Sequence, residues 1–298
     1  MKRHLRLVTA LSTAVLLLAV GCGDDDDEPS TPEAEVEEQP EFPDGTTQAR
    51  LAEQGTIRIG TKFDQPGLGN INLETDEPEG FDIEIGKTVA GKLGIEPDDI
   101  DWVETVSANR EAFIVSDRVD LVIATYTIND ERKEQVDFAG PYYVAGQDLL
   151  VAEDDDSING PDDLAGKRVC AATGSTPIQN IRENYPEAEP VEFDTYTECV
   201  DQLEAGQIDA VSTDDIILAG YAAQSQYAGK FKVVGKTFST EPYGIGLKKD
   251  DKASCDKINE ILKAAASDGR YKKAWDDTLG KSGKAAPTLD TSKLTNCS

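Results

Sequence analysis

Histidine is almost absent from this 298-residue chain, because His4 is the only one. His4 lies in an N-terminal segment that we expect to be removed, so the mature protein would have none. This excludes Ser-His-Asp and Cys-His nucleophiles, HExxH sites and histidine-ligated metals. The sequence also lacks a CxxC pair and the loops GxxxxGK[ST] and GxGxxG, which argues against zinc ribbons, thioredoxin-like chemistry and nucleotide binding. We therefore expect no catalytic residue, no metal and no cofactor.

Positive charge is scarce as well. Lysine and arginine together number 29, against 58 aspartates and glutamates, and the formal net charge is −29. So acidic a surface argues against nucleic-acid binding and against electrostatic docking on anionic lipid.

The first 22 residues have the layout of a secretory signal peptide. A basic start is followed by the apolar run 11–20 and by Gly21-Cys22, which is too short to span a bilayer. A cysteine directly after a small residue looks like a bacterial lipobox, in which Cys22 is lipidated and becomes the mature N-terminus. Ala19 stands where leucine is commoner, and the alternative is an ordinary signal peptide with a chance cysteine.

An acidic segment follows Cys22. Residues 23–41 contain ten Asp and Glu and no basic residue, so they cannot bury enough apolar surface to order themselves. We expect residues 23–49 to be a disordered tether that holds a folded domain away from the extracytoplasmic face of a bacterial cell membrane.

Four cysteines remain after Cys22, and an even number in an exported chain suggests two disulfides. Cys170 lies in a strand pattern and Cys199 in the helix pattern of a neighbouring element, whereas Cys255 opens a helix and Cys297 is penultimate. We predict the pairs Cys170–Cys199 and Cys255–Cys297, the second of which would fix the C-terminal tail 285–298.

From Thr56 onward, strand and helix patterns alternate in two series, which predicts an α/β fold with parallel strands in two lobes. The expected strands are 57–61, 100–106, 121–125, 149–152, 168–172, 189–193, 209–211, 232–234 and 244–247. The expected helices are a segment from 82 to 91 or 94, 108–116, a helix beginning near Glu131, one from Thr176, 196–205, 215–223, 252–267 and 269–278.

Residues 120–143 are the most informative stretch. An apolar run that should be a buried strand passes through Thr125 and Thr127 to Asn129, which can cap a helix. Arg132 would lie in the first turn of that helix, where the helix dipole disfavours a cation, so we expect an anion to compensate it. A guanidinium beside threonine hydroxyls is suited to bind a carboxylate. The alternative is that Arg132 pairs on a solvated face with Asp130, Glu131 or Asp137.

Ligands of open α/β sheets bind at the carboxyl ends of the strands. These positions carry cations, hydroxyls, amides at a helix start and one carboxylate, a set that suits a small zwitterion. The residues are Lys62, Ser107, Thr125, Thr127, Thr173, Gly174, Ser175, Thr176 and Asp214.

Five strings resemble the extracellular solute-binding proteins of family 3, the amino-acid-capturing subunits of ABC importers. They are GTKFDQPGLG (60–69), GFDIEI (80–85), VSANR (106–110), ATYTINDERK…DFAGPYY (124–143) and DAVSTDD (209–215). The resemblance covers roughly residues 50–280. The first and fourth strings are especially similar to actinobacterial glutamate-binding lipoproteins.

The resemblance implies a role for each matching residue. Arg132 would hold the ligand α-carboxylate with help from the amide of Thr176, and Asp214 would pair with the ammonium. Thr127 and the carbonyl of Thr125 would bind part of the ammonium or of the carboxylate. Ser107 and Arg110 would receive a side-chain carboxylate, with Lys62 as a further cation, in a second anion pocket distinct from Arg132. Ala172 replaces a lysine or polar ligand of the family, which puts that contact in doubt, and Tyr196 stands where some relatives have histidine.

Several alternatives stay open. Asp215 is interpreted as a helix N-cap, although either Asp214 or Asp215 could hold the ammonium, and Lys62 can also be an ordinary loop lysine. Phe81 and Asp82 are interpreted as helix staple and cap rather than ligands. Trp102 and Trp275 are interpreted as core.

The resemblance also implies a periplasmic-binding-protein-like fold with two crossovers and a mixed doubly wound sheet in each lobe. Lobe 1 would be residues 50–147 rejoined by 241–284, and lobe 2 residues 148–240.

The expected function is to capture glutamate first, then aspartate, asparagine or glutamine, by hinge closure, and to deliver it to an ABC permease and ATPase. We expect a lipid-anchored monomer that binds no nucleic acid and is not an enzyme. The alternatives are an amino-acid sensor module and a dehydratase-type enzyme on the same fold.

Overall fold

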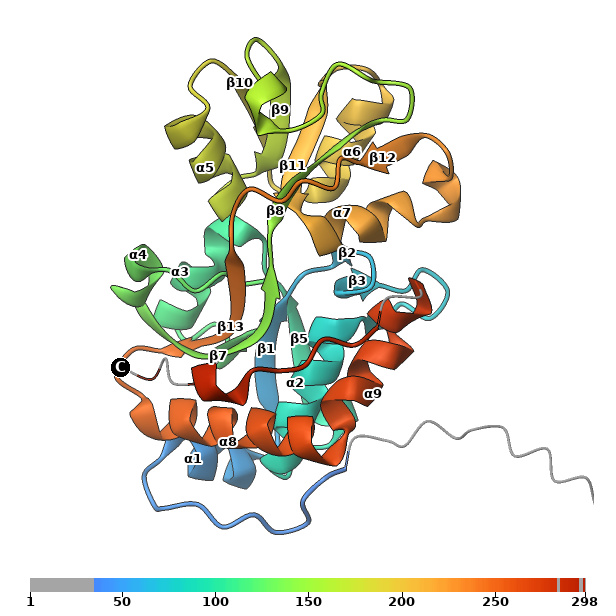
Figure 1. Ribbon diagram of the computed structural model, residues 1–298. Helices are drawn as coiled ribbons and strands as arrows, with labels where there is room; N and C mark the ends of the chain where they lie inside the picture. Colours follow the sequence, from blue (N-terminus) through green and yellow to red (C-terminus); the bar gives the residue numbers. More distant parts are fainter. Residues whose placement is uncertain (1–34, 283–284, 295–296, 298) are drawn as a thin grey trace, which may run out of the picture. The chain divides into compact units, whose positions relative to one another are not determined.

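Two five-stranded sheets organise the chain (Figure 1). A computed structural model describes residues 35–282, 285–294 and 297; the expected signal peptide, Cys22 and the first part of the tether lie outside these residues. The first sheet has the strand order β5-β1-β6-β13-β7 and the second the order β10-β9-β11-β8-β12, and a small third sheet has the order β2-β3-β4.

The strands are β1 Ile57–Thr61, β2 Asp64–Gln65, β3 Gly69–Ile71, β4 Pro78–Glu79, β5 Ile100–Glu104, β6 Leu121–Val122, β7 Val136–Ala145, β8 Gln147–Ala152, β9 Arg168–Ala172, β10 Glu189–Phe193, β11 Ala210–Asp214, β12 Phe231–Val233 and β13 Glu241–Lys248. The α-helices are α1 Thr47–Gln54, α2 Phe81–Lys92, α3 Arg110–Val115, α4 Asp130–Lys133, α5 Thr176–Asn184, α6 Tyr196–Glu204, α7 Asp215–Ala222, α8 Lys252–Asp268 and α9 Arg270–Asp277. Short 3-10 turns lie at Pro97–Asp99, Ser107–Asn109, Pro161–Asp163, Ser225–Tyr227, Leu279–Ser282 and Thr291–Lys293.

The backbone passes between the two large sheets twice. Gly146 joins β7 of the first sheet to β8 of the second, and residues 234–240 return the chain from β12 to β13. In Figure 1 the second sheet lies above the first, and both passages run between them. This is the two-lobed fold with two crossovers that the sequence predicted.

Both large sheets are mixed rather than parallel. In the first sheet β1 pairs in parallel with β5 and β6, whereas β13 runs antiparallel to β6 and β7. In the second sheet β9 is parallel to β10 and β11, whereas β8 is antiparallel to β11 and β12. The long strand β7 was not predicted, because its sequence follows the Arg132 helix without a turn signal that we recognised.

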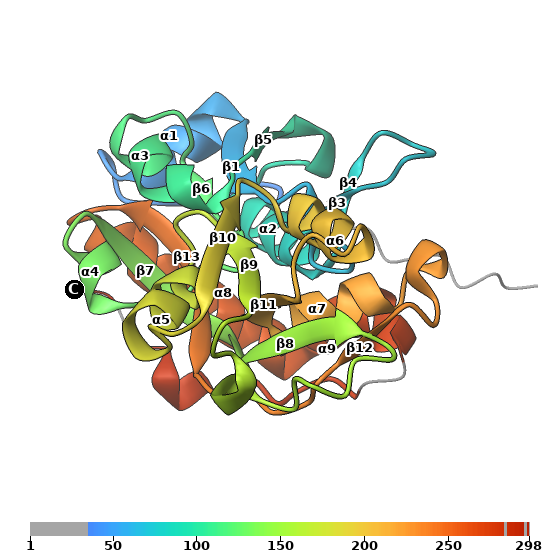
Figure 2. The same ribbon diagram turned by 90° about the horizontal axis from the view of Figure 1, so that it is seen from above.

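Each large sheet is covered by helices on both faces. Figure 2, seen from above, shows α5 and α6 on opposite sides of the second sheet. Alternate side chains of a strand point to opposite faces, so Leu121 and Ile123 belong to one apolar cluster and Val122 and Ala124 to another. Trp275 is 2% exposed in the first cluster, beside Phe81, and confirms the core interpretation; Trp102 is half-buried and packs on the same cluster.

Order begins earlier than the tether prediction allowed. α1 begins at Thr47, and the hydroxyl of Thr46 caps it. Upstream, the amide of Glu37 donates to the carbonyl of Gly91 at 2.9 Å, and Phe42 packs against the core. The prediction that the disordered segment extends to residue 49 is therefore wrong at its C-terminal end, because a few apolar and capping residues there find partners on lobe 1.

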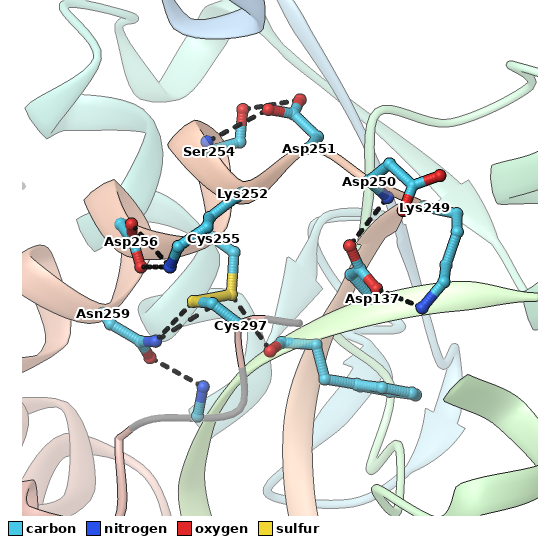
Figure 3. The surroundings of a disulfide bond; sticks show 12 residues. Asp137, Lys249, Asp250, Asp251, Lys252, Ser254, Cys255, Asp256, Asn259 and Cys297 are labelled. Atoms are coloured by element: carbon cyan, nitrogen blue, oxygen red, sulfur yellow. Dashed lines mark hydrogen bonds and ion pairs between the residues drawn. A yellow bond between two sulfur atoms is a disulfide. The ribbon is translucent and has the colours of Figure 1, made fainter. Parts of the chain in front are cut away.

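Both predicted disulfides are present. Cys170 in β9 bonds to Cys199 in α6, and Cys255 in α8 bonds to Cys297. Figure 3 shows the second bridge, where the side chain of Asn259 donates to Cys297 Sγ at 3.1 Å. The tail is thereby fixed to α8.

None of the helices in the described ranges has enough apolar length to traverse a lipid bilayer.

Candidate functional site

The end of strand β6 shapes the first part of the site. Thr125 adopts φ 44°, a left-handed conformation that is strained for a β-branched residue. Asp82 stabilises it, because its carboxylate accepts the Thr125 amide at 2.8 Å and the Tyr142 hydroxyl at 2.7 Å. Burial raises the pKa of Asp82 to about 6. The prediction that Asp82 caps α2 is wrong, since Gly80 is the N-cap residue and Asp82 instead supports the Thr125 backbone.

Lys62, Ser107 and Arg110 lie together next to this backbone. They are 3%, 2% and 2% exposed, so the interpretation of Lys62 as an ordinary loop lysine is wrong. Lys62 Nζ donates to Ser107 Oγ at 2.9 Å, and Arg110 Nε donates to the Ser107 carbonyl at 3.2 Å. Burial, and then the positive charge of Arg110, lower the pKa of Lys62 to about 7. An ammonium held in such a place is desolvated, and an anion would stabilise it.

Arg132 is 5% exposed and does not pair with its acidic sequence neighbours. Asn129 caps the single turn α4 by accepting the Arg132 amide, as predicted. The guanidinium donates to the carbonyls of Thr127 at 2.7 Å and Gly174 at 3.2 Å, and its Nε pairs with Glu111 at 3.2 Å. Each terminal nitrogen carries a second N–H, which leaves a fork for a carboxylate. Burial, and then Arg110, lower the pKa of Arg132 to about 10.

The two guanidinium groups are adjacent. Both lie over the ring of Tyr126, with centroid distances of 4.4 Å for Arg110 and 5.1 Å for Arg132. Both also donate to the carbonyl of Gly174, at 3.5 Å and 3.2 Å. With Lys62, which is linked to Arg110 through Ser107, the two arginines form one cationic wall. That Arg132 and the Lys62–Ser107–Arg110 group receive separate carboxylates stays a prediction.

The second lobe contributes the start of helix α5. Ser175 caps this helix, and Thr176 is its first residue. Thr176 Oγ lies 3.4 Å from Thr127 Oγ of the first lobe. The N-terminus of a helix carries partial positive charge and unpaired amides, so this end also favours an anion. Ala172 is buried and offers no polar side chain.

Asp214 supplies a negative group from the same lobe. It ends β11, is 3% exposed, and accepts the hydroxyl of Tyr243 on Oδ2 at 2.6 Å. Within the described residues its other oxygen, Oδ1, has no hydrogen-bond partner. Burial, and then the charge of Glu241, raise the pKa of Asp214 to about 8. A cation placed at Oδ1 would remove this penalty.

Asp215 has a different environment. Its amide and carboxylate both bond to the backbone of Gly146, at 2.8 Å and 3.4 Å. Asp214 occupies the N-cap position of α7, without a side-chain capping bond, and Asp215 is the first helical residue. The capping interpretation of Asp215 is therefore wrong, and this residue serves the first crossover.

Further contacts join the lobes on the opposite edge. The carboxylate of Asp64 accepts the amide of Tyr196 at 2.8 Å, at the start of α6, and its carbonyl accepts the hydroxyl of Tyr221. A Cβ on Gly220 in α7 would lie 2.4 Å from the carbonyl oxygen of Pro66. Tyr196 thus takes part in lobe contact through its backbone.

Sequence reasoning missed two buried or half-buried carboxylates. Glu111 follows Arg110 in α3 and pairs with Arg132, and Glu241 begins β13 and accepts the hydroxyl of Thr176 at 2.7 Å. Neither lies at the carboxyl end of a parallel strand, where we searched. The position of Glu111 beside Arg110 was the only available signal.

The sequence model of the bacterial extracellular solute-binding proteins, family 3, matches residues 57–280. This chain belongs to that family. The glutamate-binding protein GluB of Corynebacterium efficiens is 39% identical over 93% of this chain and 91% of its own length. The ABC transporter glutamine-binding protein GlnH of Bacillus subtilis is 38% identical over 91% of this chain and 95% of its own.

A solved structure of an ancestral arginine-binding protein bound to glutamine has the same fold. It is 37% identical, covers 76% of this chain and 98% of its own, and has a TM-score of 0.71. These named relatives of the family-3 chain are binding proteins rather than enzymes.

Proposed function

We propose that this protein is the substrate-binding subunit of an ABC importer and captures an acidic or polar amino acid. Glutamate is the first candidate, followed by aspartate, asparagine and glutamine. The protein itself performs no chemical reaction on the ligand.

The observation that carries this proposal is the buried cationic wall of Lys62, Arg110 and Arg132 together with the carboxylate of Asp214. Glu111 already pairs with Arg132, so the three cations leave two positive charges, which suit two carboxylates. Oδ1 of Asp214, which has no hydrogen-bond partner among the described residues, suits one ammonium. Glutamate has this charge pattern. The names of the relatives GluB and GlnH are consistent with a ligand of this size.

We assign the groups to the ligand as the family resemblance implies. Arg132 binds the α-carboxylate with the amide of Thr176, and Asp214 binds the ammonium with Thr127 and the carbonyl of Thr125. Lys62, Ser107 and Arg110 bind the side chain.

Closure follows from where these groups lie. We assign residues 50–146 and 241–282 to lobe 1 and residues 147–240 to lobe 2, since Gln147 begins β8 of the second sheet. Arg132 belongs to lobe 1 and Asp214 to lobe 2, so one ligand bridges both lobes and binds the closed arrangement best. The hinge consists of the two crossovers.

In the cell, Cys22 carries a lipid that anchors the protein outside the cell membrane. The monomeric protein then delivers its ligand to a permease served by an ATPase. A sensor that reports the amino acid to a kinase would bind the ligand equally well. Uptake of glutamate by cells that lack the gene distinguishes the two functions, because only loss of a transporter would abolish it.

Isothermal titration against the twenty amino acids, with chromatography of the recovered ligand, tests the proposal. We expect glutamate to bind most tightly and to be recovered unchanged; a converted ligand would indicate a dehydratase-type enzyme instead. Arg110→Ala should weaken glutamate binding by about 2–4 kcal/mol and glutamine binding by less. Equal losses for both would contradict the acidic-ligand assignment.

A further inference from the structure

Glu241 is a buried carboxylate that no ligand role above uses. It is 4% exposed and begins β13, directly after the second crossover. Its Oε2 accepts the hydroxyl of Thr176 at 2.7 Å, and its Oε1 accepts the hydroxyl of Ser239 at 2.5 Å. A buried carboxylate opposes folding unless it is hydrogen-bonded, and such groups concentrate at functional sites.

The partners of Glu241 connect both crossovers with helix α5. Ser239 Oγ accepts the amide of Gln147, the first residue after the first crossover, at 3.0 Å. The side chain of Gln147 in turn donates to the carbonyl of Pro177 at 3.2 Å and accepts from Asn180 at 2.6 Å. The first turn of α5 is thus held by a hydrogen-bonded chain that runs through the hinge.

Strand β13 also carries two groups that act on Asp214. Glu241 and Tyr243 are two residues apart, so their side chains leave the strand on the same face. Tyr243 donates to Asp214 Oδ2, and the negative charge of Glu241 opposes ionisation of Asp214. The charged and titratable groups that act on Asp214 are Glu241 and Tyr243 of β13, Asp215 of α7, Arg110 of α3, Tyr143 of β7 and Tyr196 of α6.

We propose that Glu241 is a positioning residue for the ligand: through the Thr176 hydroxyl it fixes the first turn of α5 to the hinge, so that the Thr176 amide meets the ligand carboxylate when the lobes close. This inference rests on the proposed amino-acid binding. Glu241 acts on the ligand through Thr176, and through its charge it sets the pH at which Asp214 accepts an ammonium.

Two variants of Glu241 test this by titration with glutamate between pH 6 and pH 9.5. Glu241→Ala should lower affinity about 10- to 100-fold, because the Thr176 hydroxyl loses its charged acceptor. Glu241→Gln keeps an oxygen for Thr176 and should retain most of the affinity at pH 9. Loss of the neighbouring negative charge should lower the pKa of Asp214. As the pH is lowered from 9, the affinity of this variant should therefore begin to fall at a lower pH than the affinity of the wild type.

Glu74→Gln is the matched control. It removes the same charge from an exposed position on the loop between β3 and β4, and we expect the wild-type affinity and pH profile. Thermal unfolding of each variant shows whether it is folded. If Glu241→Ala does not fold, the pH profile of the Gln variant still tests the inference.

A double-mutant cycle with Thr176→Val isolates the contribution of the hydrogen bond between Thr176 and Glu241. Valine removes the hydroxyl but keeps the backbone amide, so a second substitution at Glu241 should then change affinity at pH 9 less than about 3-fold. An equal loss in both backgrounds, or a pH profile of Glu241→Gln that matches the wild type, would overturn the inference. Wild-type protein that binds none of the twenty amino acids would instead overturn the proposed function.

Discussion

Replacement of Lys62 by methionine should make the protein more stable and a weaker glutamate binder. Lys62 is 3% exposed, and burial lowers its pKa from the ordinary value of 10.5 to about 7. Methionine fills a similar volume without a charge. A residue that costs stability in the free protein but serves the ligand is what a binding site requires.

The magnitude follows from the pKa. Each unit corresponds to 1.36 kcal/mol, so the shift from 10.5 to about 7 opposes folding by about 5 kcal/mol when both states are protonated. Ser107 loses the Lys62 hydrogen bond in the variant, which offsets about 1 kcal/mol. We therefore expect Lys62→Met to raise the free energy of unfolding by roughly 3–4 kcal/mol at pH 6.

The effect should depend on pH in a definite direction. Between pH 7 and pH 10.5 the unfolded chain keeps the lysine proton and the folded protein does not, so wild-type stability rises with pH in this window. At pH 9 the remaining penalty is about 2 kcal/mol. The advantage of the variant should shrink to about 1 kcal/mol there.

Guanidinium unfolding of the ligand-free proteins at pH 6 and pH 9 measures both quantities, with Lys263→Met on the exposed face of α8 as control. Titration should show glutamate affinity lowered about 10- to 100-fold and glutamine affinity lowered less. A variant that is less stable at both pH values, or whose effect is independent of pH, would refute the reasoning.

Three further predictions concern the carboxylate fork, closure and the tail. Arg132→Ala should weaken glutamate binding by about 3–5 kcal/mol, or two to four decades in affinity, in calorimetry. Scattering profiles with glutamate should show less compaction for this variant than for the wild type. Identical compaction would place the ligand elsewhere. Gly220→Ala should favour helix α7 by about 1 kcal/mol, but it places a methyl group 2.4 Å from the Pro66 carbonyl oxygen of the other lobe. The affinities for glutamate and for glutamine should therefore fall equally, while the melting temperature stays unchanged. Unchanged affinities would show that this contact is not needed for closure. Cys255→Ser opens a bridge across a sequence separation of 42, and loss of the link to Cys297 should lower the unfolding free energy by roughly 4 kcal/mol; no change in chemical unfolding would contradict a stabilising tail.

Much of the fold followed from local patterns. The strands Ile57–Thr61, Arg168–Ala172 and Glu189–Phe193 have the bounds that were predicted, because each is a short run bounded by turn residues. The capping of α4 by Asn129 was predictable for the same reason, since a cap and its helix are neighbours in sequence. The even number of cysteines and their places in the elements were enough to predict both disulfides.

Only the tertiary structure decided how the chain arranges its charges. Arg110 and Arg132 share the ring of Tyr126 through packing within lobe 1, and they share the carbonyl of Gly174 through contact between the lobes. Asp82 supports Thr125, 43 positions away, and Glu241 holds Thr176, 65 positions away. A sequence shows that a carboxylate is present, but it does not show whether that carboxylate is buried or which distant donor it meets. The residue types of the site were thus written in the sequence, whereas their pKa values, their partners and the cationic wall came from tertiary packing, which for the cationic wall lies within lobe 1.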